Sequence, residues 1–165
     1  MIKQIILLNG PSSSGKSTLS RALQAVITET RGENYSIISI DDYMKIATDE
    51  TIYEDDVFDI SGDMCDGALK DLETAPGVII DHVITSPRIF QQLQDRLGRH
   101  TLHLVRVCCP LEVLLERELA RKNRCIGSAE SSYTYLYPRE GYHLTVDTSR
   151  MTPDACARQI CTQLL

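Results

Sequence analysis

One short segment, Gly10 to Thr18, constrains the fold more than any other part of the chain, because it matches a complete phosphate-binding loop of the form G-x-x-x-x-G-K-[ST]. The apolar run Ile5 to Leu8 precedes it directly, and a helical pattern follows. The two glycines allow the backbone to curl so that successive N–H groups point at phosphate oxygens, while the next helix N-terminus adds partial positive charge. The residues expected to contact a nucleoside triphosphate are Gly10, Pro11, Ser12, Ser13, Ser14, Gly15, Lys16, Ser17 and Thr18.

Two side chains of this loop have more specific expected roles. Lys16 is predicted to reach the β- and γ-phosphates, and Ser17 is predicted to offer its hydroxyl to Mg²⁺. A Gly/Ser-rich turn that contains a lysine by chance is the alternative, but the strand before it, the helix after it and the match at every position favour a nucleotide site.

Length and charge limit the kinds of partner. The 165 residues suit one domain, and the formal net charge of -6 argues against nucleic acid or an anionic membrane as partner, since these attract basic surfaces. No apolar stretch approaches the roughly 20 residues that span a bilayer. We therefore expect a cytoplasmic protein that acts on a small molecule; the sequence leaves its oligomeric state open.

The six cysteines include no C-x-x-C pair, so the spacing typical of a zinc site is missing. We expect reduced cysteines that pack as small apolar side chains.

Apolar runs alternate with helical periodicity along the chain, which is typical of an α/β domain with a parallel sheet. Strands are expected near residues 2–8, 35–40, 78–84, 102–108 and 143–146. Helices are expected around residues 19–27, 64–72, 89–97, 111–119 and 156–164. Two stretches, 47–60 and 126–142, fit neither pattern and are interpreted as loops, either substrate-facing or ordinary surface loops.

The run Val78 to Asp81 is an apolar strand that ends in a carboxylate, which is the expected place for an aspartate that holds Mg²⁺ through its water shell. His82 follows, where a motor ATPase would need a glutamate, and the chain lacks the Asn-Lys-x-Asp guanine reader of GTPases. Both absences favour transfer to an acceptor over hydrolysis. A strand-end turn aspartate is the alternative interpretation of Asp81.

Two carboxylates, Asp41 and Asp42, follow the predicted strand that ends at Ile40. A positioned carboxylate can take the proton of an acceptor hydroxyl that attacks the γ-phosphoryl group. Strand alternation turns only one of the two toward the site, and we select Asp41 as the base. Asp42 can instead cap a short helix that begins at Tyr43.

Three arginines, Arg117, Arg121 and Arg124, have the spacing i, i+4 and i+7 and are predicted to share one face at the end of a helix. Such a group can stabilise the charge on a transferring phosphoryl group. We expect Arg121 and Arg124 to be catalytic, and Arg117 and Arg121 to bind the nucleotide. The alternative is a solvated basic face, with Glu118 and Lys122 as an ordinary surface pair.

Taken together, these segments resemble the chloramphenicol phosphotransferase family of phosphate-loop kinases. The similarity rests on the opening run 5–17, the second strand before Asp41, Val-Ile-Ile-Asp-His at 78–82, the arginine segment 117–124 and Val-Asp-Thr at 146–148. It implies a three-layer α/β/α sandwich with a five-stranded parallel sheet, an arginine-bearing lid at about 117–130, ATP with Mg²⁺, and Asp41 as the base. It also implies that the loop 147–153 borders the adenine.

The acceptor is expected to be a small hydroxylated molecule, with chloramphenicol as one candidate. Tyr43, Tyr53 and Phe58 are possible lining residues, and core packing is the alternative for Phe58. A nucleoside, nucleotide or shikimate-like metabolite kinase is the alternative enzyme. A regulatory domain that binds ATP without an acceptor is the alternative outside enzymes.

Overall fold

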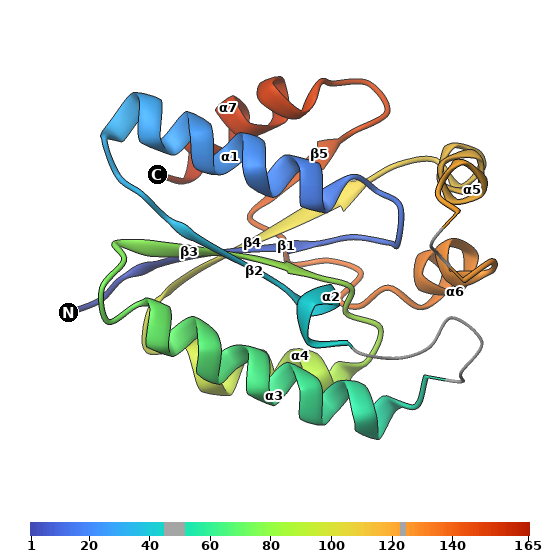
Figure 1. Cartoon of the computed structure of the whole chain (residues 1–165), viewed down its shortest axis with the longest axis horizontal. Helices are drawn as coiled ribbons and strands as arrows, with labels where there is room; N and C mark the ends of the chain where they lie inside the picture. The colour runs from blue at the N-terminus through green and yellow to red at the C-terminus, as the bar shows by residue number, and fades with distance from the viewer. Residues whose placement is uncertain (45–51, 123–124) are drawn as a thin grey trace.

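The computed structural model describes residues 1–44, 52–122 and 125–165. Its centre is a five-stranded parallel sheet with the order β2-β3-β1-β4-β5 (Figure 1). The strands are β1 (Gln4–Asn9), β2 (Ser36–Ser39), β3 (Gly77–His82), β4 (Thr101–Cys108) and β5 (Leu144–Asp147). The predicted parallel sheet of five strands is therefore confirmed.

Helices cover both faces of the sheet and give three layers (Figure 1). Helices α1 (Lys16–Arg31) and α7 (Pro153–Leu164) pack on one face. Helices α3 (Glu54–Asp71) and α4 (Pro87–Leu97) pack on the other. The remaining helices, α2 (Ile40–Tyr43), α5 (Leu111–Ala120) and α6 (Ser128–Tyr135), lie beyond the carboxyl ends of the strands.

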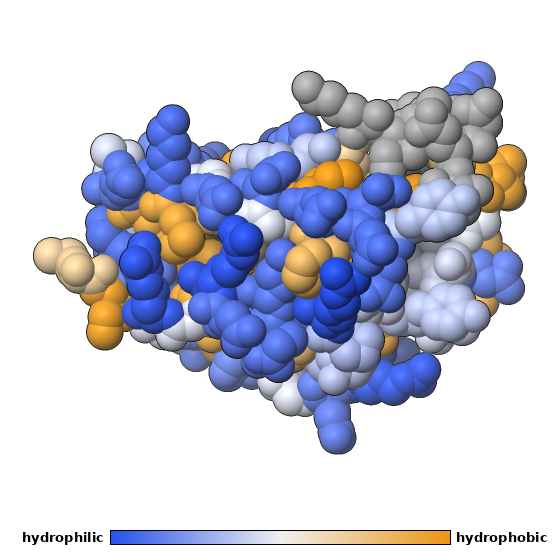
Figure 2. All heavy atoms as spheres, turned by 90° about the horizontal axis from the view of Figure 1, so that it is seen from below, coloured by the Kyte–Doolittle hydropathy of each residue, from blue (hydrophilic) through white to orange (hydrophobic). Residues whose placement is uncertain are grey.

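The central strands are apolar because helices cover them on both sides. All six residues of β3 are buried, and Ile5 to Leu8 of β1 are fully buried. Alternate side chains enter opposite layers, so that Ile5 and Leu7 pack toward α3 and α4, while Ile6 and Leu8 pack toward α1. The outer face of α3 and α4 is largely hydrophilic (Figure 2), as expected for amphipathic helices. In the described part of the chain, no helix has both the length and the apolar character needed to cross a membrane.

The structure corrects three local predictions. Strand β2 ends at Ser39, and Ile40 already begins the short helix α2. Residues 54–60 belong to helix α3, and residues 128–135 form α6, so both stretches interpreted as loops contain helix. Three acidic residues form the first turn of α3, where they interact favourably with the helix dipole. Helix α6 is rich in serine and tyrosine. Neither segment therefore shows the apolar periodicity by which a helix is predicted.

The sheet brings the ends of three strands to one edge. Leu8 of β1 pairs with Asp81 of β3, and Asp81 pairs with Ser39 of β2. Parallel strands present their carboxyl ends together, so the loops after β1, β2 and β3 meet at this edge.

Candidate active site

The loop between β1 and α1 is held in a tight curl. Ser13 has φ 70 and Gly15 has φ 89, two left-handed conformations that turn the backbone before α1 begins. Gly10 lies so close to β4 that an added Cβ would collide with the carbonyl oxygen of Val107. The loop therefore requires glycine at both positions, at Gly10 because there is no room for a side chain and at Gly15 because of its positive φ.

Lys16 is buried, with 6% of its surface exposed. Its ammonium donates to the carbonyl oxygen of Pro11 at 2.9 Å and to the hydroxyl of Ser14 at 3.4 Å. A buried ammonium requires such partners, and the two oxygens hold its charge inside the curl of the loop.

Two residues from distant segments hold the loop from behind. Arg117 of α5 donates to the carbonyl oxygens of Ser13 at 3.4 Å and of Thr148 at 3.1 Å. The hydroxyl of Thr148 donates to the carbonyl oxygen of Ser14 at 2.6 Å. The carbonyl oxygens of Ser13 and Ser14 are thus bonded on the outer side of the loop. N–H groups that face the inner side of such a loop are suited to bind an anion.

Helix α6 contacts the loop as well. The Ser132 hydroxyl accepts a hydrogen bond from the backbone N–H of Ser12 at 2.9 Å. The buried carboxylate of Glu118 accepts from the N–H groups of Gly127 at 3.2 Å and Ala129 at 2.9 Å, and so anchors the N-terminus of α6 to α5. Glu118 is thus not the surface partner of Lys122 that the sequence suggested.

A chain of hydrogen bonds runs along the strand ends. Ser17 donates to Asp81 Oδ2 at 2.8 Å, and Ser39 donates to the same oxygen at 3.4 Å. Ser39 is also the N-cap of α2 and accepts from the N–H of Asp41 at 3.3 Å. The phosphate loop is therefore connected to the start of α2 through Asp81, which is 3% exposed.

A cavity of about 830 Å³ opens along this chain. Its polar end includes Ser12, Ser13, Gly15, Lys16, Ser17 and Asp81. Its apolar lining residues include Ile40, Met44, Ile52, Val57, Val83 and Ile126. Asp41 and Arg121 also line the cavity, and α6 forms one wall through Ser128, Ser131 and Ser132.

The structure separates the two neighbouring aspartates. Both are exposed in the first turn of α2, but of the two only Asp41 lines the cavity. The cap of α2 is Ser39, so the capping role suggested for Asp42 is wrong.

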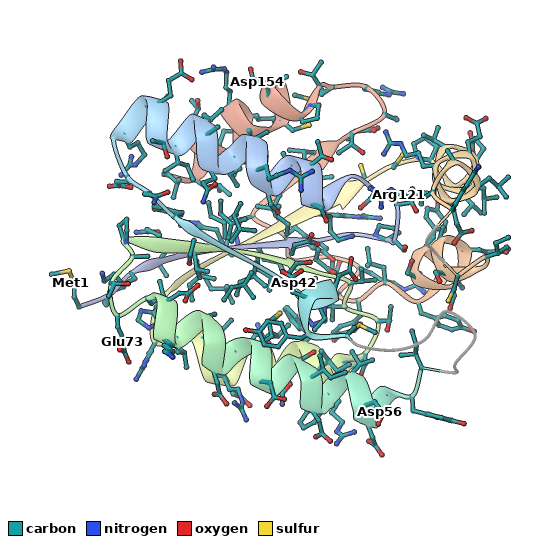
Figure 3. The ribbon with its side chains drawn as sticks, in the orientation of Figure 1. Met1, Asp42, Asp56, Glu73, Arg121 and Asp154 are labelled. Carbon is teal, nitrogen blue, oxygen red and sulfur yellow. The ribbon has the colours of Figure 1, made fainter. Side chains whose placement is uncertain are left out.

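Arg117 and Arg121 do not share one helical face, because α5 ends at Ala120 and Arg121 is its extended C-cap. Arg121 lines the cavity, whereas Arg117 lies behind the phosphate loop. Arg124 lies outside the described residues. Figure 3 shows Arg121 at the end of the molecule opposite Met1.

Four other residues that the sequence analysis named do not line the cavity: Thr18, Tyr43, Tyr53 and Phe58. Thr18 is exposed on α1. Tyr43 contacts the core near α3, and Phe58 packs beneath the guanidinium of Arg88, 4.0 Å from its ring centre, as the core-packing alternative predicts. Tyr53 is 65% exposed.

Four residues around the cavity were missed by sequence reasoning: Ser39, Glu118, Ser132 and Thr148. Serine is common everywhere, so nothing in the sequence marked Ser39 or Ser132, and Thr148 was quoted only as part of the family resemblance, without its contact to the loop. Glu118 gave one usable signal, because it follows Leu114 at helical spacing on the buried side of α5.

Behind Asp81, the fully buried His82 pairs with the Ser61 hydroxyl through Nε2 at 2.9 Å. Burial lowers the pKa of His82 to about 4, so its imidazole is neutral at neutral pH. The cysteines are free thiols, of which Cys65, Cys109 and Cys156 are buried. Burial is the first cause of the raised pKa of each of these three thiols.

The residues present fit a nucleotide with a divalent cation. The Ser13 hydroxyl is buried without a hydrogen-bond partner in the described part of the chain, and it lies in the curl whose N–H groups favour phosphate. The Ser17 hydroxyl and the Asp81 carboxylate lie side by side and provide hard oxygen ligands of the kind Mg²⁺ prefers. Within the described residues there is no separate cluster of His, Cys, Asp and Glu suited to a metal.

The sheet order, the phosphate loop and the cavity beside α2 define a phosphate-loop kinase fold. A family model confirms this class. The chain belongs to the chloramphenicol phosphotransferase-like protein family, whose model matches residues 3–165, and phosphoryl transfer is the activity class of that family. No curated relative matches the sequence.

Solved structures with this fold include three small kinase-like proteins. The APS kinase of Mycobacterium tuberculosis, in complex with AMPPNP and APS, superimposes with a TM-score of 0.76 and 14% identity over 99% of this chain and 98% of that one. A gluconokinase of Sinorhizobium meliloti gives 0.68 and 18% over 99% of each chain. The tunicamycin resistance protein of Deinococcus radiodurans gives 0.66 and 22% over 98% and 95%. At these identities the similarity shows a common fold.

Proposed function

We propose that this protein transfers the γ-phosphoryl group of ATP to a hydroxyl of a small, largely uncharged molecule. The observation that carries the proposal is one cavity that is lined by the phosphate loop, by Asp41 and by a set of apolar side chains. The hydrogen-bonded chain from Ser17 through Asp81 and Ser39 fixes the phosphate loop and the start of α2 relative to each other. Such a fixed separation is what transfer between two bound reactants requires.

At the donor end, the loop amides and Lys16 would hold the phosphates, and Ser17 and Asp81 would hold Mg²⁺. Bound there, Mg²⁺ would neutralise charge on the phosphate oxygens. The loop does not need to rearrange its backbone for this task, because Arg117 and Thr148 already bind its outward carbonyls.

At the acceptor end, Asp41 would accept the proton of the attacking hydroxyl. Its position in the cavity supports this role, as does the hydrogen bond from its N–H to Ser39, which fixes the first turn of α2. Arg121, which also lines the cavity, would stabilise negative charge on the transferring group. The role predicted for Arg124 stays part of the same proposal.

The wall beside Asp41 favours an acceptor with a substantial apolar part. Val57, Val83 and Ile126 are among its apolar members, and the cationic side chains among the described lining residues are Lys16 and Arg121. If both serve the phosphates, none of the described lining residues remains to bind an anionic acceptor. An amphiphilic alcohol therefore fits better than an acidic metabolite, and chloramphenicol is one such molecule.

The test compares Asp41→Asn with its neighbour Asp42→Asn in a coupled assay with Mg²⁺-ATP. Hydroxylated antibiotics, nucleosides, sugars and shikimate serve as acceptors. We expect Asp41→Asn to lower kcat by roughly 10² to 10⁴, the usual contribution of a general base. Asp42→Asn should retain the wild-type rate, and calorimetry should show similar ATP affinity for all three proteins.

Three results would contradict the proposal or favour one of its alternatives. Wild-type turnover by Asp41→Asn would exclude this carboxylate as the base. ATP binding without phosphorylation of any acceptor would favour the regulatory alternative, whereas activity confined to nucleosides or shikimate would favour the alternative metabolite kinases.

A further inference from the structure

A second cavity, of about 270 Å³, lies on the other side of α6 and shares no lining residue with the first. It is lined by Arg106, Tyr133, Thr134, Leu136, Pro138 and Arg139. Helix α6 and the segment just after it separate the two cavities, since Ser131 and Ser132 line one, and Tyr133 and Thr134 line the other. The volume far exceeds the roughly 10–15 Å³ that a single water needs.

Arg106 occupies an unusual place for a charge. On β4 it continues the row of Leu102 and Leu104, whose side chains pack in the layer of α3 and α4. Its Nε is buried and has no hydrogen-bond partner in the described part of the chain. A buried guanidinium donor without an acceptor costs folding free energy, and an oxyanion bound at this position would satisfy it.

The protein offers little negative charge to these arginines. In the described residues, neither Arg106 nor Arg139 forms an ion pair, although acidic side chains outnumber basic ones 23 to 17 in the whole chain. The contact of Arg106 with an aromatic face is distant, with its Cζ 6.0 Å from the ring centre of Tyr142. Arg139 is exposed at the rim, where its contact is a 3.5 Å hydrogen bond to the carbonyl oxygen of Thr134.

Several hydrogen bonds fix the segment 137–142, which contributes Pro138 and Arg139 to the cavity. Asn9 donates to the carbonyl oxygen of Tyr137 and to the Tyr142 hydroxyl, both at 2.9 Å. Tyr142 in turn donates to the carbonyl oxygen of Pro138 at 2.6 Å. The N–H of Tyr137 donates to the carbonyl oxygen of Ile84 at 2.9 Å. The cavity is thus preformed, and a ligand would not have to order its wall.

We propose that this cavity is a second binding site, distinct from the phosphotransferase cavity, for a small molecule that carries a phosphate or carboxylate group. Arg106 would bind the oxyanion from inside through Nε and a terminal nitrogen, and Arg139 would bind it from the rim. A guanidinium presents two parallel N–H groups to an oxyanion, which is the geometry that an unpaired Nε leaves open. The inference does not depend on the reaction proposed above.

The experiment observes Arg106 directly. In ¹⁵N-labelled protein, the buried Nε–H of Arg106 should exchange slowly and give a resolved signal, assigned by its loss in Arg106→Lys. Inorganic phosphate and acetate are titrated separately, each against NaCl of equal ionic strength. The same titrations in Lys16→Ala separate this site from the phosphate loop, since the Arg106 shift should then have the same midpoint in both proteins.

We expect a saturable shift of the Arg106 Nε–H with one or both oxyanions. Phosphate alone would identify a phosphate-bearing ligand, and acetate alone a carboxylate. Arg139→Gln, a change at the exposed rim that should not affect folding, should weaken binding about tenfold or more, because charge-assisted hydrogen bonds are lost. Arg21→Gln, an exposed arginine of α1 on the opposite face of the sheet, is the matched control and should leave the midpoint unchanged.

Thermal stability provides an independent readout. In the Lys16→Ala background, which removes the ammonium of the phosphate loop, phosphate or acetate should raise the Tm, and it should not do so when Arg106→Gln is added. The proposal is overturned if neither oxyanion shifts the Arg106 signal beyond the NaCl control. It is equally overturned if Arg139→Gln binds as tightly as Arg21→Gln, or if the midpoint moves with Lys16→Ala.

Discussion

The two ends of the active-site cavity are built in opposite ways. At the donor end, Lys16 and Ser14 are buried, and side chains from α5, α6 and the segment after β5 hold the phosphate loop. At the acceptor end, Asp41 and Ile126 are exposed, and the apolar wall is formed largely by side chains that are not themselves tied by polar contacts.

This difference indicates where each end can change. A substitution of Arg117, Thr148 or Ser132 breaks a contact between the phosphate loop and a distant segment. A substitution in the acceptor wall breaks no such polar link, although Ile40, Met44 and Val57 also pack in or against the core. The architecture therefore separates a fixed phosphoryl-donor site from a wall on which acceptor preference can vary.

Of three further variants, the one with the largest expected effect tests the donor end. Lys16→Met retains most of the side-chain stem but removes the ammonium that bonds to Pro11 and Ser14. We expect kcat to fall by about 10² to 10³, the usual loss when one preorganised charge-stabilising donor is removed. Steady-state kinetics with Mg²⁺-ATP measure this loss. The control is Lys70→Met, which changes an exposed lysine of α3. A Lys16→Met variant that retains more than half the wild-type kcat would show that the Lys16 ammonium is not required for phosphoryl transfer.

An intermediate effect tests the link between the donor end and α6. Glu118→Ala leaves the N–H groups of Gly127 and Ala129 without their acceptor, which costs about 1–3 kcal/mol of unfolding free energy. Glu118→Gln retains one acceptor oxygen and should lose less. Urea denaturation measures both, and Glu116→Ala, exposed on the same helix, should be near wild type. Equal stability of Glu118→Ala and Glu116→Ala would contradict the anchoring role.

The smallest expected effect tests the acceptor wall. Val57→Thr changes a half-buried methyl of the cavity to a hydroxyl with little change in volume. We expect the KM for an apolar acceptor to rise by roughly fivefold, or about 1 kcal/mol, with the KM for ATP unchanged. Leu119→Thr, 70% exposed outside the cavity, is the control. If the KM for ATP rises together with that of the acceptor, the two ends are not independent.

Much of the fold could be predicted from sequence, because its signals are local and strong. Apolar runs marked the strands, and the stripes at Leu19 to Ile27 and Ile89 to Leu97 marked helices whose buried faces the structure confirms. The helical part of 47–60 was missed, since acidic residues dominate its first turn and the apolar spacing begins only later.

The site was predictable where a motif fixes the backbone, and less so where distant segments meet. The phosphate loop needs glycine at 10 and 15 for steric reasons that any sequence must respect. The Thr148 and Ser132 contacts join residues more than a hundred positions apart, and a hydroxyl gives no sign of its partner in the sequence. Arginine spacing was misleading because the helix ends at Ala120, before its pattern is complete.

The bond between the Ser132 hydroxyl and the N–H of Ser12 ties α6 to the phosphate loop, and α6 also lines the cavity through Ser128, Ser131 and Ser132. The N–H of Ser12 is therefore satisfied by a protein hydroxyl and is not left for a phosphate oxygen. One helix of eight residues thus braces the loop and shapes the space beside it.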